Sequence, residues 1–239
     1  MRRNSNAMLP ALVIAAWLTS PPAQITAQSA SGSPATAAPA TQVYSNAELH
    51  LTYAYPAGLT PRDSAFAEAI GRRMIFGEDA EADFAKAHAC AKVLLSVGKG
   101  AEGSPGTWVR LGLVAIGDPC APATVMQKKK ATQSLLGDLV RQGTTLMGLM
   151  PVERPTIYLI EGHWASFCAA QGTPVTGQDL QTGGDQLIGV AVVAVEGKVL
   201  GWIIQTNDAA TFNQLLGTGV DFGTGKPERL FAGAVGQNY

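Results

Sequence analysis

The feature that most limits how this chain can fold is a pair of apolar segments near its C-terminal end. The first, Leu187–Val195, reads LIGVAVVAV and is apolar on both faces of a strand. It therefore predicts a strand in the middle of a sheet that is covered on both sides. The second, Lys198–Thr206, follows after only Glu196 and Gly197, which is the length of a tight hairpin loop. We expect this hairpin to lie near the centre of a sheet.

Further apolar patterns predict additional strands, and their short or Gly-rich connections indicate antiparallel pairing. Gly98–Gly106 predicts a long hairpin loop, and Gly162-His163 predicts a tight connection. The predicted strands are Leu49–Tyr55, Ala91–Val97, Thr107–Ile116, Thr156–Glu161, Trp164–Ala170 and a short edge strand at Val220–Phe222.

Three segments predict helices. Thr60-Pro61-Arg62-Asp63 is a typical helix start, and the helix that follows should end at Gly77. Thr124–Met150 carries an apolar stripe, and a last helix is capped by Asn207 or Asp208. The order of strands and helices predicts an α+β fold with a mainly antiparallel sheet and helices packed on it.

The core should lie between the central hairpin and the longest helix. We expect Trp202, Ile204, Val190 and Val192 to share one core. The apolar stripe that covers it should include the helix residues Leu135, Leu139 and Met147.

The N-terminal region is typical of an exported protein. Arg2 and Arg3 precede the short apolar run Met8–Leu18, and small residues and prolines follow. We expect residues 1–27 to be a general secretory signal peptide, with an uncleaved membrane anchor as the alternative, and residues 28–42 to be a low-complexity linker. The single folded domain should span 43–224, followed by a loosely ordered tail at 225–239. No Cys precedes Cys90, so we expect a secreted or periplasmic protein rather than a lipoprotein, with no stable transmembrane segment once the signal is removed.

Composition excludes two classes of protein. The chain has 17 Lys and Arg residues against 18 Asp and Glu residues, a near balance that argues against binding to nucleic acid. It is 46% hydrophobic, which excludes wholesale disorder.

The sequence contains no recognisable catalytic motif. Neither Gly100–Gly103 nor Gly223–Lys226 has the spacing of a phosphate-binding loop, so both predict flexible loops. One constellation could bind zinc or copper or form a Cys–His nucleophile pair. Its members are His88, Cys90, His163 and Cys168. Their spacing is unusual for zinc, and we assign no catalytic, cofactor-binding or metal-binding residues.

The three cysteines predict one disulfide in an oxidising compartment. Cys90 and Cys120 flank the predicted hairpin of Ala91–Val97 and Thr107–Ile116, so we expect these two to pair. Cys168 should then stay a buried thiol. The pairs Cys90–Cys168 and Cys120–Cys168 remain open at this point.

Several segments together resemble the PsbP-like α/β/α sandwich superfamily. They are the opening strand with its aromatic-Pro end (Leu49–Pro56), the late hairpin Leu187–Thr206, and an Asp-Ala-Ala-Thr-Phe helix that runs into Val220–Phe222. The resemblance covers about residues 43–224, with departures at Gly71–His88 and Gly98–Gly106. It implies an exported or membrane-associated domain that supplies binding or assembly surfaces, with no catalytic residues to carry over.

Two functions follow from these observations. The first is an exported, non-catalytic domain that binds an unknown protein or small-molecule ligand, without a cofactor, in the cell envelope or outside the cell. The alternative is a small extracytoplasmic metal-binding or Cys/His-dependent enzyme. The absence of a strong acid–base or nucleophile motif favours the first.

Overall fold

The computed structural model describes residues 40–77, 89–102, 106–145, 149–152, 154–172, 175–176, 180–181 and 185–231. The chain divides into two compact units, Met1–Ala38 and Pro39–Tyr239, and the described residues all lie in the second. The expected signal peptide and almost all of the expected linker therefore lie outside the described residues. The first strand, β1 (Thr41–Asn46), begins two residues before the expected start of the domain at Val43.

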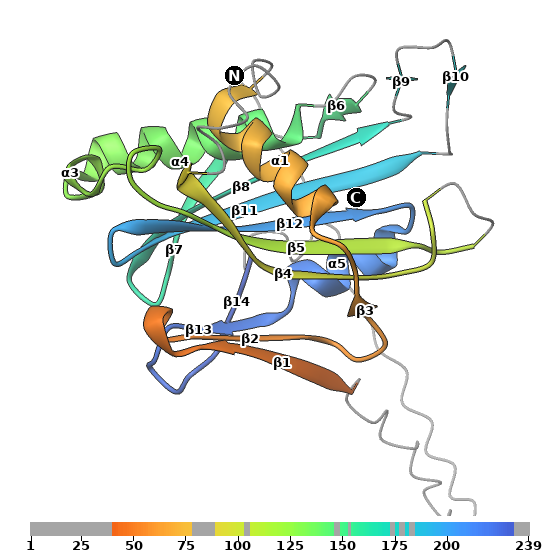
Figure 1. Ribbon diagram of the computed structural model, residues 1–239, viewed down its shortest axis with the longest axis horizontal. Helices are drawn as coiled ribbons and strands as arrows, with labels where there is room; N and C mark the ends of the chain where they lie inside the picture. The colour runs from red at the N-terminus through yellow and green to blue at the C-terminus, as the bar shows by residue number, and fades with distance from the viewer. Residues whose placement is uncertain are drawn as a thin grey trace, which may run out of the picture. The chain divides into compact units, whose positions relative to one another are not determined.

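The centre of the second unit is an eight-stranded antiparallel sheet (Figure 1). Its strand order is β3-β4-β5-β12-β11-β8-β6, and β7 also pairs with β8. The strands are β3 (Thr60–Pro61), β4 (Ala91–Lys99), β5 (Val109–Ile116), β6 (Leu149–Pro151), β7 (Thr156–Ile160), β8 (His163–Gly172), β11 (Gln186–Val195) and β12 (Lys198–Thr206). The predicted hairpin of β11 and β12 thus lies in the middle of the sheet, between β8 and β5.

A smaller sheet joins the two ends of the described chain. Its order is β1-β2-β13-β14, where β2 is Leu51–Pro56, β13 is Gly219–Asp221 and β14 is Glu228–Arg229. A 3-10 turn, Ala47–Leu49, connects β1 to β2. Two short strands, β9 (Val175–Thr176) and β10 (Leu180–Gln181), pair only with each other among the described residues.

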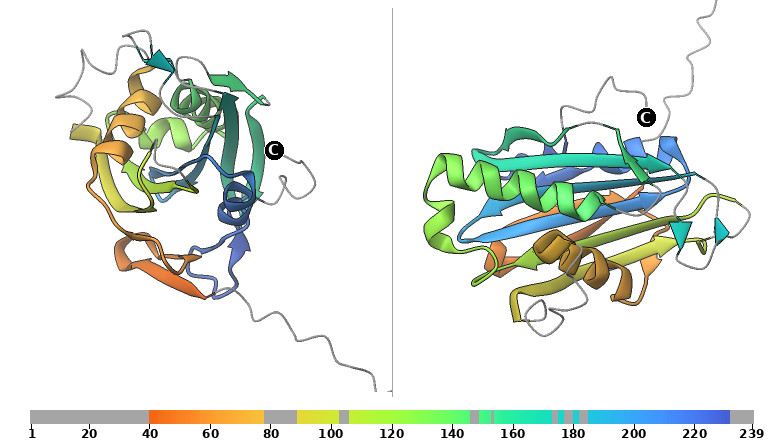
Figure 2. Two further views of the ribbon diagram at one scale, coloured as in Figure 1. Left: turned by 90° about the vertical axis from the view of Figure 1, so that its right-hand side faces the viewer. Right: turned by 90° about the horizontal axis from the view of Figure 1, so that it is seen from above.

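Helices cover both faces of the large sheet. Helices α1 (Ala65–Phe76) and α4 (Lys129–Thr144) lie on one face (Figures 1 and 2). The short helix α3 (Ala123–Met126) precedes α4, and α5 (Ala209–Leu216) lies with the small sheet on the opposite face. The predicted α+β fold, with a mainly antiparallel sheet and helices packed on it, is confirmed.

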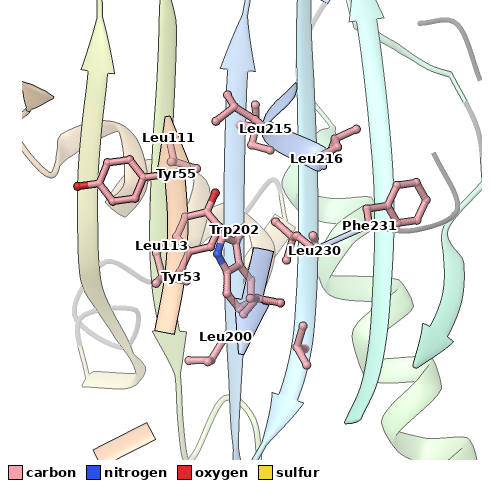
Figure 3. Close-up of a cluster of buried hydrophobic side chains, with 14 of the residues drawn as sticks. Tyr53, Tyr55, Leu111, Leu113, Leu200, Trp202, Leu215, Leu216, Leu230 and Phe231 are labelled. Carbon is pink, nitrogen blue, oxygen red and sulfur yellow. The ribbon is translucent and has the colours of Figure 1, made fainter. Parts of the chain in front are cut away.

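The large sheet separates two hydrophobic cores. Val190 and Val192 face α1 and α4, where they pack with Leu139. Trp202 and Ile204 belong to the other core, with Tyr53 of the small sheet and Leu215 of α5. Figure 3 shows Trp202 among the side chains of this core. The expectation that the two valines share one core with Trp202 and Ile204 is wrong, because Val190 lies opposite Ile203 and not opposite Trp202 or Ile204. Successive side chains of a strand point to opposite faces.

Two predicted helix boundaries are also wrong. The segment predicted as one helix, Thr124–Met150, forms α3 and α4, and its last residues belong to the edge strand β6. Thr60 and Pro61 form β3, and α1 begins only at Ala65, whose N–H is accepted by Asp63 Oδ1 at 3.1 Å. Met147 lies outside the described residues.

Part of the expected loose tail is packed. Leu230 and Phe231 are buried, and the Leu230 N–H donates to the Thr218 carbonyl at 2.8 Å. Residues 225–231 therefore belong to the folded domain, because two large apolar side chains outweigh the Gly-rich composition around them. Residues 232–239 lie outside the described residues.

Candidate functional site

The predicted cysteine pair is brought together at the end of the β4–β5 hairpin. The Sγ atoms of Cys90 and Cys120 lie 2.00 Å apart, and their Cα atoms are 5.7 Å apart. This Cα separation lies in the range that a disulfide requires. The Gly117 N–H donates to the Cys90 carbonyl at 2.9 Å, which holds the two arms of the hairpin in place. Cys168 is buried and takes no part in a disulfide.

The proposed metal or thiol constellation is not assembled by its described members. His163 and Cys168 both belong to β8 but point to opposite faces of the sheet. The His163 ring packs edge-on against Phe222 with 5.1 Å between centroids, whereas Cys168 Sγ accepts from Thr144 Oγ1 of α4 at 3.5 Å. His88 lies outside the described residues. Across the described parts of the chain, no three His, Cys, Asp or Glu side chains are grouped so that they could hold a metal ion.

The loop at Gly223–Lys226 is occupied by a side chain of the protein itself. The Asp221 carboxylate accepts the backbone N–H groups of Gly223, Thr224 and Gly225 at 2.8–3.1 Å. These are the donors that a phosphate-binding loop would present to its ligand. The loop is therefore closed by an internal carboxylate.

A polar cleft lies where α1 begins and the β4–β5 loop starts, with a volume of about 380 Å³. Arg110 forms a 3.0 Å ion pair with Glu102, and its guanidinium lies 5.6 Å from the centre of the Phe66 ring. Arg62 Nη2 donates to the Gly100 carbonyl at 3.0 Å. Both arginines thus already bind groups of the protein within the cleft.

Two buried glutamines extend this network under the cleft. Gln205 Nε2 donates to Gln186 Oε1 at 2.7 Å, and Gln186 Nε2 donates to Glu102 Oε1 at 3.2 Å. Since buried amides are costly unless they are hydrogen-bonded, this chain fixes the end of the sheet to the β4–β5 loop. The sequence does not indicate this network, because its members lie far apart in the chain and form no local motif.

The second candidate surface is the β6–β7 edge of the large sheet. Three of the four exposed large hydrophobic side chains among the described residues lie there. They are Met150 (73% exposed), Val152 (43%) and Leu159 (53%), and we call this group the apolar edge. Met150 lies opposite Gln171 near one end of β8 and Leu159 opposite Trp164 near the other, so the exposed side chains follow the length of this edge and do not form one patch.

The opposite edge of the large sheet carries features that discourage pairing with another chain, and β7 carries none of them. On the opposite edge, β3 contains Pro61, and β4 has an exposed Lys92 and a register shift between Val93 and Leu95. Strand β7 reads TIYLI and contains no charge or proline. Among the described residues it pairs only with β8, so its outer edge has backbone groups available for pairing.

Tyr158 attaches β7 to the last described residues of the chain. Its hydroxyl donates to the Leu230 carbonyl at 2.8 Å, and its ring packs against Phe231 with 5.2 Å between centroids. Burial raises the pKa of the Tyr158 phenol well above its usual value, so the hydroxyl stays protonated as a donor. These contacts attach β7, and with it the exposed Leu159, to the segment Leu230–Phe231.

Comparisons with known proteins give no family assignment. No family model and no curated protein match the sequence. A solved structure of PA94, a protein of unknown function from Pseudomonas aeruginosa, matches with a TM-score of 0.31 and 11% identity. The match covers 72% of this chain and 87% of that one. A similarity this low carries no argument about function.

Proposed function

We propose that this protein is an exported, non-catalytic binding or assembly domain that acts in the cell envelope or outside the cell. The apolar edge is its binding surface, and the observation that carries the proposal is the unprotected strand β7 with the exposed Leu159. We also propose that the domain belongs to the PsbP-like superfamily. The central antiparallel sheet, with helices on both faces, supports that membership.

The location outside the cytoplasm is supported by two kinds of observation. The N-terminal sequence has the basic, apolar and small-residue segments of a secretory signal. Cys90 and Cys120 lie at bonding distance, and disulfides persist mainly in oxidising compartments. No helix in the described part of the chain is long and apolar enough to cross a membrane.

The chemical groups of β7 and of the polar cleft favour a binding role over catalysis. Leu159 presents an exposed apolar side chain, and β7 presents backbone donors and acceptors, which is how sheets recruit extended chains. In the polar cleft, in contrast, Arg110 is paired with Glu102 and Arg62 donates to the Gly100 carbonyl. The Ser96 hydroxyl there donates to the Asp63 backbone carbonyl and not to a side-chain base, which a nucleophile would need.

Partner capture from envelope extracts tests the proposal. Tagged wild-type protein is compared with Leu159→Lys and with Val43→Lys, a matched control because Val43 is 59% exposed on β1, outside the apolar edge. We expect a stoichiometric protein, either another protein or an untagged copy of this chain, that is retained by wild type and by Val43→Lys but lost with Leu159→Lys.

Two results would count against the proposal. Equal recovery of proteins by all three baits would show that the apolar edge is not the binding surface. Stoichiometric zinc or copper in the purified protein would support the alternative, a metal-binding protein or enzyme.

A further inference from the structure

We infer that the partner of the apolar edge is a second copy of this chain, bound by antiparallel pairing of β7 with β7 of the other copy. This inference rests on the proposed function, since it names the occupant of the surface assigned there. A two-fold axis through the pair would join two large sheets into one continuous sheet.

The side chains of β7 complement one another in this arrangement. An axis through Tyr158 places Ile157 of each copy opposite Leu159 of the other. Both residues lie on the α4 side of the sheet, where Ile157 Cδ1 lies 4.0 Å from a Cβ built at Gly137 of α4. Residues directly opposite in an antiparallel pair share a face and pack against each other. The exposed Leu159 would thus be covered by an apolar side chain at two symmetric positions.

The charges at the ends of β7 favour the antiparallel orientation. Arg154, exposed, precedes the strand, and Glu161 follows it. The Glu228 carboxylate lies at the same end as Glu161, because it accepts the Glu161 N–H at 3.0 Å. The Glu161 carboxylate itself is turned inward, since its Oε2 accepts the Phe222 N–H at 2.9 Å, so the exposed Glu228 carries the negative charge at this end. Antiparallel pairing brings Arg154 of each copy to the end that carries Glu228 of the other, whereas parallel pairing would align like charges. Glu153 lies outside the described residues.

The oligomeric state of the full chain gives the first test. Light scattering after size exclusion should show a dimer for wild type and for Val43→Lys. Leu159→Lys should raise the dimer dissociation constant at least about tenfold, because a charge would replace an apolar contact at both symmetric positions. Arg154→Glu should weaken the dimer as well, and this loss should shrink as salt is raised.

Cross-linking tests the register. The double variant Ile157→Cys/Leu159→Cys should form a covalent dimer under mild oxidation, since the two new thiols lie opposite each other across the axis. Leu159→Cys alone should cross-link several-fold less, and wild type should not cross-link at all, because Cys168 is buried.

Three results would overturn the inference. The first is a chain that stays monomeric up to about 100 μM, and the second is a dimer that Leu159→Lys leaves unchanged. The third is equal cross-linking of the single and double variants. A monomeric chain that still captures a different protein through Leu159 would overturn the dimer and leave the proposed function standing.

Discussion

Ala67 of helix α1 lies directly against Gly112 of strand β5. A Cβ atom built at position 112 would stand 2.8 Å from the Cβ of Ala67 and 3.7 Å from the Cβ of Ile203. The helix can approach the sheet this closely only because residue 112 has no side chain. The close packing of α1 on β5 therefore depends on the glycine at position 112.

Gly112→Ala should destabilise the protein by about 1–3 kcal/mol, the usual cost of overpacking a core. Gly117→Ala is the matched control, because a Cβ there would meet nothing within 4 Å. Urea denaturation of the two variants measures the difference. Equal midpoints would show that α1 can shift away from the sheet at little cost.

Leu139→Ala should remove packing between α4 and the large sheet. Leu139 is buried in the core with Val190 and Val192, and truncation of a buried leucine costs about 2–5 kcal/mol. Leu135→Ala, on the same helix but only partly buried, should cost clearly less. Thermal or chemical denaturation checks both, and an unmoved midpoint for Leu139→Ala would contradict the packing of α4.

The bond between Cys90 and Cys120 should be present in the native protein. Peptide mapping without reductant should recover the two cysteines linked, and both should resist alkylation. Because the bond closes a loop of 30 residues, reduction should lower the free energy of unfolding by about 3.5 kcal/mol on the chain-entropy account. Free alkylation of both residues in unreduced protein would refute the pairing.

Asp208 should make stability depend on pH in the acid range. Its carboxylate accepts the hydroxyl and the backbone N–H of Thr211, and these hydrogen bonds lower the pKa of Asp208. Asp208 is the N-cap of α5. Its carboxylate therefore stabilises the fold at pH values above the pKa of about 3.9 that Asp has in the unfolded chain. This contribution is lost as the pH falls through the lower pKa of Asp208 in the folded protein.

Asp208→Ala should cost about 1 kcal/mol at pH 7, the usual value for an N-cap, and much less once the pH falls below the lowered pKa of the folded Asp208. Asp208→Asn keeps a cap acceptor without a titrating group, so it should retain most of the neutral stability and lose the pH dependence. Denaturation curves across this pH range give the comparison. A constant difference between wild type and Asp208→Ala would contradict the assignment.

The centre of the large sheet could be predicted from the sequence of a single strand. Leu187–Val195 is apolar on both faces, which requires cover on both sides wherever the strand lies. This pattern does not show which residues of the neighbouring strand lie on each face of the sheet. The sequence pattern therefore predicts one core for Trp202, Ile204 and Val190, and only the cross-strand register separates them.

The β6 part of the apolar edge could not be predicted, because its residues also fit the apolar spacing of a helix. Residues Leu146–Met150 continue the apolar spacing of α4, so the sequence predicts a helix where β6 forms an edge strand. The polar cleft was hidden for a different reason. Gln186 and Glu102 are hydrogen-bonded across 84 positions of the chain, and no local spacing indicates such a contact. The first strand, β1, has little apolar character and forms through its pairing with β2.

The pairing of β2 with β13 limits the order in which the protein can fold. Tyr53 lies opposite Val220, and its hydroxyl accepts from Thr218 Oγ1 across 165 positions of the chain. Since the chain emerges with its N-terminus first, β2 stays unpaired with β13 until nearly all the described chain has emerged. The β4–β5 hairpin, with its two cysteines only 30 positions apart, can form long before that. The core around Trp202 is therefore completed last. Until then β2 has an unpaired edge, so it is the segment that can pair wrongly for the longest time.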